Sequence, residues 1–136
     1  MKTDTVRRGR QVVFCLHVHL VFVTSRRGKV LGERVLVQLR EAMAAVCADF
    51  GAELLELEGE DDHLHLLVAY PPKVALATLV NSLKGVSARL LRQADLPELR
   101  NKFAGRAFWS PSYCAVSGGD DALQLIAEFL RQQRVP

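Results

Sequence analysis

The spacing of hydrophobic residues changes several times along this chain, and each change marks a new element. Over residues 11–24 every second residue is apolar, which predicts a long strand. The opposite face of that strand carries Cys15, His17 and His19. Over residues 32–50 the apolar residues recur every three or four positions, which predicts an amphipathic helix.

The same reasoning predicts a β-hairpin, a second helix and a fourth strand. Residues 52–58 and 62–70 are strand-like segments joined by a short acidic turn, and two prolines end the second segment. Helical spacing returns over residues 74–93, and residues 108–116 are again strand-like.

A last helix follows a Ser-Gly-Gly joint. We expect Asp120 to cap its first turn and the helix to run to Gln133. Helical spacing gives this helix a buried stripe made of Leu123, Ile126, Ala127 and Leu130.

The predicted order is β-α-β-β-α-β-α, an α+β fold. The compact arrangement that fits it is a ferredoxin-like (RRM-like) antiparallel sheet with two helices on one face and an additional C-terminal helix. The other sheet face is left open for function. We expect a single domain over residues 1–136, with residues 10–116 as the core and residues 120–133 as the C-terminal helix, because 136 residues can bury one core.

The charge is mildly basic and unevenly distributed. The formal net charge is +3 and the pI is about 9.0. Clustered cations suit a polyanion such as nucleic acid, although each cluster taken alone is more often a solvated surface. The clustered residues are Arg7, Arg8, Arg10, Arg26, Arg27, Lys29, Lys84, Arg89 and Arg92.

The cysteines and the lengths of the apolar runs indicate where the protein works. Cys15, Cys47 and Cys114 are odd in number, widely spaced and set among apolar residues, which predicts reduced, buried thiols. The first ten residues are polar and basic, and no apolar run reaches the length of a membrane span. We therefore expect a cytoplasmic protein.

Two histidines in the third predicted strand are the strongest candidates for chemistry. His63 and His65 are two residues apart, so both imidazoles project from one face, as two ligands of one metal ion would. In a ferredoxin-like sheet the first and third strands are neighbours, which allows His17 and His19 to share that face. The alternative is that His17 and His19 are partly buried polar residues satisfied by hydrogen bonds.

The last helix offers a third metal ligand. Phe129 and Gln133 are four residues apart and lie side by side on that helix. Two neutral imidazoles and an amide oxygen leave positions open for water or phosphate, which suits Mg²⁺ or Mn²⁺ acting as a Lewis acid. The alternative for Gln133 is a solvated helix end.

Five segments in a fixed order carry a resemblance to a known family. The chain resembles the TnpA-type single-tyrosine transposases of small bacterial insertion sequences that move as single-stranded DNA, members of the His-hydrophobic-His (HUH) endonuclease superfamily. The resemblance extends over residues 9–133 and rests on segments 17–24, 62–67, 83–89 and 108–113 and on the last helix.

The resemblance implies a homodimer that acts on single-stranded DNA hairpins at the element ends. It implies that His63, His65 and Gln133 hold the divalent ion, which polarises the scissile phosphate. A helix tyrosine then attacks and leaves a 5′-phosphotyrosine and a free 3′-hydroxyl. Phosphate contacts would come from the basic side chains Arg7, Arg8, Arg10, Arg26, Arg27, Lys84, Arg89 and Arg92.

The sequence departs from this pattern at the nucleophile. Four residues before the glutamine the family carries tyrosine, and this chain carries Phe129, which has the ring without the hydroxyl. Three explanations remain open: an engineered substitution that traps an uncleaved complex, a natural homologue that binds without cutting, or use of Tyr113 or Tyr70 instead.

We therefore expect a transposase whose cleavage is defective. Two rival classes remain. One is a non-cleaving, hairpin-binding regulator built on the same scaffold. The other is a ferredoxin-like metal-binding or RNA-binding domain with no role in transposition, which would show no preference for single-stranded DNA hairpins.

Overall fold

The structure is a computed structural model that describes residues 6–9, 11–103 and 105–133. Two short 3₁₀ segments, η1 and η2, interrupt the larger elements. In chain order the elements are β1 (Arg7–Arg8), β2 (Val13–Phe14), β3 (His17–Thr24), η1 (Ser25–Arg27), α1 (Glu33–Asp49), β4 (Glu53–Gly59), β5 (His63–Ala69), α2 (Leu76–Ala94), η2 (Pro97–Leu99), β6 (Trp109–Ser117) and α3 (Ala122–Gln132).

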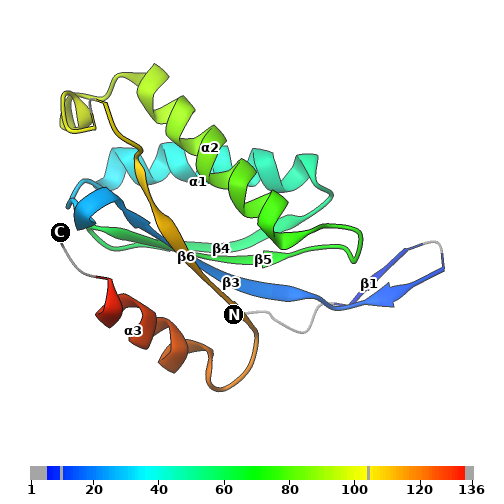
Figure 1. The fold of residues 1–136 in the computed structure, drawn as a ribbon. Helices are drawn as coiled ribbons and strands as arrows, with labels where there is room; N and C mark the ends of the chain where they lie inside the picture. Colours follow the sequence, from blue (N-terminus) through cyan, green and yellow to red (C-terminus); the bar gives the residue numbers. More distant parts are fainter. Residues whose placement is uncertain (1–5, 10, 104, 134–136) are drawn as a thin grey trace.

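The main sheet has four antiparallel strands in the order β4-β5-β3-β6. This is the predicted ferredoxin-like order, because the first and third of its strands in chain order, β3 and β5, lie side by side at the centre. Figure 1 shows α1 and α2 together on one face of the sheet and α3 on the other. The α+β fold class is therefore confirmed.

The core lies between the sheet and the α1/α2 layer. Strand β3 is buried along its whole length, because one face meets the helices and the other is partly covered. Its residues Val18, Leu20 and Phe22 point toward the helices and pack with Leu64 and Leu66 of β5. The histidines of these two strands occupy the alternate positions and so face away from the core.

The first strand is shorter than its hydrophobic pattern predicts. The main sheet begins at His17, and β2 pairs with β1 in a small separate hairpin. Gly9 closes the turn with a hydrogen bond from its amide to the Val12 carbonyl (2.7 Å). Val12 and Val13 are exposed there. Alternation therefore predicted the extended conformation correctly but not the strand's partner.

The last helix also differs from its prediction. Asp121, and not Asp120, is its N-cap residue, and that side chain makes no capping hydrogen bond. Ala122 and Ile126 are buried, whereas Leu123 is 71% exposed. Ala127 is exposed as well. The helix is rotated relative to the predicted stripe, because it rests on the edge of a single sheet face and has no second layer against its other side.

The cysteines form no disulfide, but they are not all buried as predicted. Cys47 lies in the core, where burial raises the pKa of its thiol to about 11, while Cys15 is exposed. No helix in the described part of the chain is long and apolar enough to cross a membrane.

One buried hydrogen bond fastens the edge strand β6 to helix α2. The Trp109 indole Nε1–H donates to Ser87 Oγ (3.0 Å), and that hydroxyl donates to the Lys84 carbonyl (3.2 Å). Both Trp109 and Ser87 are buried, so neither group has water as an alternative partner.

Replacing Ser87 tests how much this hydrogen bond contributes to the stability of the protein. Ser87→Ala leaves the indole N–H unsatisfied, and we expect it to lower the free energy of unfolding by about 1 to 3 kcal/mol. Urea denaturation followed by the fluorescence of the single tryptophan measures it. Ser82→Ala on the same helix is the control and should change stability by less than about 0.5 kcal/mol. Equal values for the two variants would contradict the assignment.

Candidate active site

The histidines gather on the sheet face opposite the α1/α2 layer, which was predicted to be open and is partly covered by α3 (Figure 1). In the register of β3 and β5, His65 lies opposite Val21 and His63 lies opposite Val23, so His17, His19, His63 and His65 share one face. His19 Nδ1 and His65 Nε2 are 2.9 Å apart, a hydrogen-bond distance between the two strands. The predicted grouping of these imidazoles is confirmed.

The His19–His65 pair is held neutral. Burial lowers the pKa of His65, and the nearby His19 lowers it further. Burial also lowers the pKa of His19. Both rings therefore favour their neutral forms, with one N–H in the hydrogen bond between them. A metal ion binds only a deprotonated imidazole nitrogen, so His65 offers its Nδ1 to a metal in the tautomer whose Nε2–H donates to His19.

The second candidate ligand, His63, is oriented by Asp62. His63 Nδ1 donates to Asp62 Oδ1 (3.0 Å), and Arg27 Nε donates to Asp62 Oδ2 (2.9 Å). Burial raises the pKa of Asp62, but the hydrogen bonds and charges of His63 and Arg27 outweigh it, so the net pKa is lowered. The ionised carboxylate fixes the tautomer of His63 and leaves its Nε2 lone pair available to a ligand.

The same arginine reaches the end of α3. Arg27 Nη1 donates to the carbonyl oxygens of Leu130 (3.0 Å) and Gln133 (3.2 Å). Those carbonyls close the helix, where a positive charge is favourable. Phe129 lies half-buried one residue before Leu130, and Gln133 is the half-buried C-cap residue. The sheet is thus connected to the segment that carries Phe129 and Gln133 through His63, Asp62 and Arg27.

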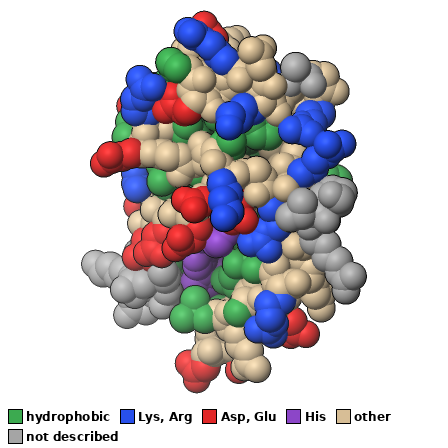
Figure 2. Space-filling model, turned by 90° about the vertical axis from the view of Figure 1, so that its left-hand side faces the viewer, with side chains coloured by type: hydrophobic (Ala, Val, Ile, Leu, Met, Phe, Trp, Pro, Cys, Tyr) green, Lys and Arg blue, Asp and Glu red, His purple; other side chains and the backbone are tan. Residues whose placement is uncertain are grey.

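A basic cavity opens beside this network. It has a volume of about 320 Å³ and is lined by Arg26, Arg27, Arg106 and Gln133, together with Val23, the residue opposite His63. In Figure 2 the histidine surface is open to the viewer, with acidic side chains on one side of it and Lys and Arg side chains above and on the other. Three guanidinium groups suit a phosphate of a nucleic-acid backbone.

The chemistry of this face fits a divalent metal held by few protein ligands. Within residues 6–9, 11–103 and 105–133, no three His, Cys, Asp or Glu side chains converge on one point. Two imidazoles on one strand are instead an incomplete ligand set that leaves positions for water and phosphate oxygens, and Gln133 lines the adjacent basic cavity.

The predicted DNA-binding residues fall into two groups. Arg8, Arg26, Arg89 and Arg92 are exposed. Of these, Arg92 also donates to the Arg106 carbonyl (2.8 Å). The other described members are half-buried and have contacts within the chain. Arg7 donates to the Gly51 carbonyl, Arg27 joins the network above, and Lys84 Nζ donates to the carbonyl of Ser110 (2.7 Å). Arg10 lies outside the described residues.

Neither tyrosine is brought to the imidazole face. Tyr113 lies opposite Phe22, so it shares the helix-facing side of the sheet, and Lys84 Nζ is 5.8 Å from its ring centroid. Tyr70 packs partly buried against the core. The position of Tyr113 does not favour it as an alternative nucleophile.

The sequence did not reveal one contact and one residue of the site. Asp62 belongs to the histidine motif and Arg27 to a cluster of cations, but nothing in their spacing indicates that they bond to each other. Arg106 comes from an irregular loop without periodicity, and only the fold brings it next to Arg26 and Arg27.

Comparison with known proteins decides the family. The sequence profile described as "Transposase IS200 like" matches residues 12–133, nearly the whole chain. This chain belongs to the IS200-like transposase family. The family acts on insertion sequences, and its members are enzymes that cleave and rejoin DNA.

Individual members of the IS200-like family agree with this assignment. The chain is 32% identical to the ISDra2 transposase TnpA of Deinococcus radiodurans, over 94% of this chain and 91% of that protein. It is 28% identical to the IS200 transposase of Salmonella typhimurium, over 85% of this chain and 74% of that protein.

Solved structures also match. A crystal structure of a candidate transposase from Deinococcus radiodurans superposes with a TM-score of 0.86 at 31% identity, covering 96% of this chain and 99% of that one. A REP-associated tyrosine transposase bound to a REP hairpin shares the fold, with a TM-score of 0.53 at 15% identity, covering 82% of this chain and 61% of that one.

The contact between Arg27 and α3 can be tested by hydrogen exchange. Arg27→Ala removes two charged hydrogen bonds to the helix end, and we expect the α3 amides to exchange at least about 10-fold faster, with α1 and α2 unchanged. Arg26→Ala is the matched control, because both residues have positive φ and Arg26 is exposed. If α3 exchanges equally fast in both variants, Arg27 does not hold the helix.

Proposed function

We propose that this chain is a single-strand-specific DNA transposase scaffold whose nucleophile position is Phe129 and whose metal ligands are His63, His65 and Gln133. The observation that carries the proposal is the contact chain from His63 through Asp62 and Arg27 to the end of α3. It joins His63 to the segment that carries Phe129 and Gln133, the positions of the family's tyrosine and glutamine.

Each residue has a distinct role in this proposal. A bound Mg²⁺ or Mn²⁺ supplies Lewis-acid polarisation of the scissile phosphate. Asp62 holds His63 with its Nε2 outward, and His19 holds His65 in position. The guanidinium groups of Arg26 and Arg106 bind the phosphate oxygens that enter the basic cavity.

The nucleophile position explains why the scaffold binds without cutting. In an active enzyme, the tyrosine oxygen loses its proton and bonds to phosphorus. The bond from phosphorus to the 3′ oxygen breaks, which leaves a 5′-phosphotyrosine and a 3′-hydroxyl. The energy of the broken phosphodiester is kept in the new one, so rejoining needs no external source. The ring of Phe129 has no oxygen to offer, and cleavage stops before this step.

The DNA substrate is a single strand with hairpins at the element ends. The fold neighbour bound to a REP hairpin supports hairpin binding by this architecture. The exposed Arg8, Arg26, Arg89 and Arg92 are available for phosphates, while Arg7, Arg27 and Lys84 are half-buried and bonded within the chain.

A homodimer is also part of the proposal. On α3, Leu123 is 71% exposed and Leu125 is 46% exposed, so this helix exposes apolar side chains on both flanks of its buried residues Ala122 and Ile126 in the single chain. We expect sedimentation velocity to give a dimer, and Leu123→Glu combined with Leu125→Glu to shift it toward monomer. A wild-type protein that stays monomeric at micromolar concentration would contradict this assembly.

The second candidate function is a regulator that binds hairpin DNA and never cleaves it. Phe129 itself favours it, since a natural chain with this residue would occupy element ends without forming a covalent product. The transposase scaffold and the regulator share the same DNA-binding surface. They differ only in whether a hydroxyl at position 129 restores DNA cleavage.

Restoring the hydroxyl tests the nucleophile position. We expect Phe129→Tyr, incubated with labelled single-stranded element-end DNA and Mg²⁺ or Mn²⁺, to form a covalent protein–DNA adduct on a denaturing gel. The chain with Phe129 should bind the same DNA and form none. The adduct should disappear with EDTA, and in the double variants that add His63→Ala or His65→Ala.

Other outcomes have definite meanings. An adduct in the unchanged chain that is lost in Tyr113→Phe would assign the chemistry to Tyr113 and overturn the role of Phe129. Binding without any adduct in Phe129→Tyr would favour the regulator. Absence of binding in all variants would reject both candidates.

A further inference from the structure

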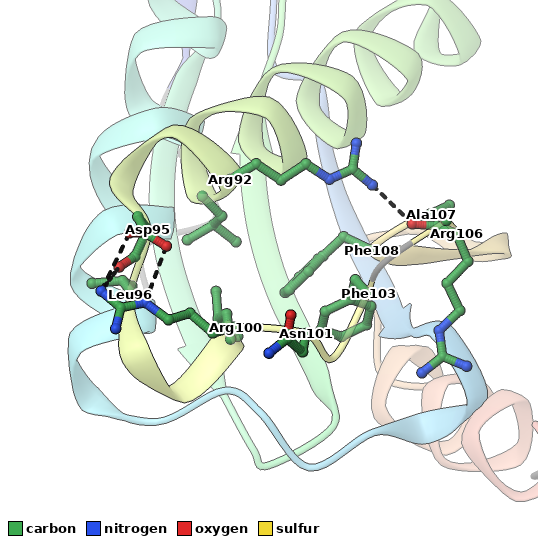
Figure 3. A pocket seen from close by; sticks show the side chains of 12 residues that line it. Arg92, Asp95, Leu96, Arg100, Asn101, Phe103, Arg106, Ala107 and Phe108 are labelled. Atoms are coloured by element: carbon green, nitrogen blue, oxygen red, sulfur yellow. Dashed lines mark hydrogen bonds and ion pairs between the residues drawn. The ribbon is translucent and has the colours of Figure 1, made fainter.

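A second cavity lies on the helix side of the molecule, away from the histidine face. It has a volume of about 690 Å³ and opens between the C-terminal turn of α2, η2 and the loop that leads to β6 (Figure 3). Nothing in the proposed reaction uses it. Its volume is in the range of sites that bind small organic groups.

The cavity has an aromatic and aliphatic wall. Phe103 and Phe108 lie with ring centroids 4.7 Å apart, and Phe108 meets Trp109 edge-on at 4.7 Å. Phe108 and Trp109 are buried, whereas Phe103 is only half-buried and packs against the Phe108 ring. The part of the Phe103 ring left exposed belongs to the cavity wall, as a flat apolar surface on a rigid support.

The rim of the cavity is basic. Arg100 forms an ion pair with Asp95 (3.2 Å), which cancels the one carboxylate among the lining residues. Arg92 and Arg106 are exposed and have no carboxylate partner among the described residues. Arg92 Nη2 donates to the Arg106 carbonyl (2.8 Å), which fixes the arginine side chain along the rim in Figure 3.

The two cavities share a residue. Arg106 lines this one and also the basic cavity beside His63 and Gln133. Its guanidinium carbon lies over the Phe103 ring, 5.8 Å from the ring centroid, so the cation and the aromatic ring are adjacent in one surface. Arg106 therefore links the cavity that suits a phosphate to the cavity with the aromatic wall.

We propose that this cavity binds an unpaired nucleobase of the single strand that passes the histidine face. The base stacks on Phe103, and the phosphates on either side of it contact Arg92 and Arg106. This inference rests on the proposed function, since it assumes a DNA strand at the site. A flat aromatic wall with cations at its rim matches a nucleotide, which has a π-face and an adjacent anion, better than an uncharged apolar ligand.

The wall can be tested without knowing the element sequence. The probes are a fluorescein-labelled 12-nucleotide oligothymidine and a 12-nucleotide abasic strand, which has the same phosphates and no bases. We expect the unchanged protein to bind oligothymidine at least about 5-fold more tightly, as expected from stacking of one base. Phe103→Leu should remove most of this difference and leave the affinity for the abasic strand unchanged.

A matched variant distinguishes the loss of base stacking from a general loss of protein stability. Phe50→Leu changes a phenylalanine that is also partly buried against the core but does not line the cavity, and it should keep the full preference for oligothymidine. Arg92→Ala should weaken binding of both strands by a similar factor, because its contact is with phosphate. An unchanged preference in Phe103→Leu would overturn the proposal.

Photocrosslinking places the base directly. Oligothymidine carrying one 5-iododeoxyuridine should crosslink to Phe103, which trypsin isolates by cutting after Lys102 and Arg106. A crosslink found only on other peptides would also overturn the subsite, while leaving the proposed function intact. If neither strand binds the unchanged protein, the proposed function fails with it.

Discussion

The carboxylate of Asp62 is the contact on which the candidate site depends. It accepts from His63 on one side and from Arg27 on the other, and Arg27 in turn holds the last carbonyls of α3. Asp62 and Arg27 are both partly shielded from water, so these charge-assisted bonds are stronger than surface ion pairs. These bonds fix the C-terminal end of α3, next to Phe129 and Gln133, relative to the start of the strand that carries the histidines.

The rest of the fold makes that contact possible. The α1/α2 layer buries the residues of β3 and β5 on one face of the sheet, so the other face can hold polar groups without loss of the core. Two side-chain atoms on that face are unsatisfied. His17 Nε2 and Glu56 Oε2 are buried and lack a hydrogen-bond partner among the described residues. Such atoms are destabilising in a free protein and are expected where a ligand completes a site.

Local patterns predicted the elements well and their long-range partners poorly. The period of two in β3 and β5 predicted which histidines share a face, since alternation fixes the face of a strand once the neighbours are known. The same period did not reveal that Val13 and Phe14 would pair with Arg7 and Arg8, and the helical period misplaced the buried stripe of α3. The bonds of Arg27 and the place of Arg106 arise from contacts between distant segments, which no local pattern encodes.

The central claim is that Phe129 faces a metal bound by His63 and His65. Fluorine NMR of the protein labelled with 4-fluorophenylalanine tests it directly, because bound Mn²⁺ broadens the signal of a nearby ring. The chain has six phenylalanines, and Phe→Leu variants assign each signal to its residue. We predict that Mn²⁺ broadens the Phe129 signal most and that His63→Ala together with His65→Ala prevents it. Broadening of a different ring, or of none, would contradict the account.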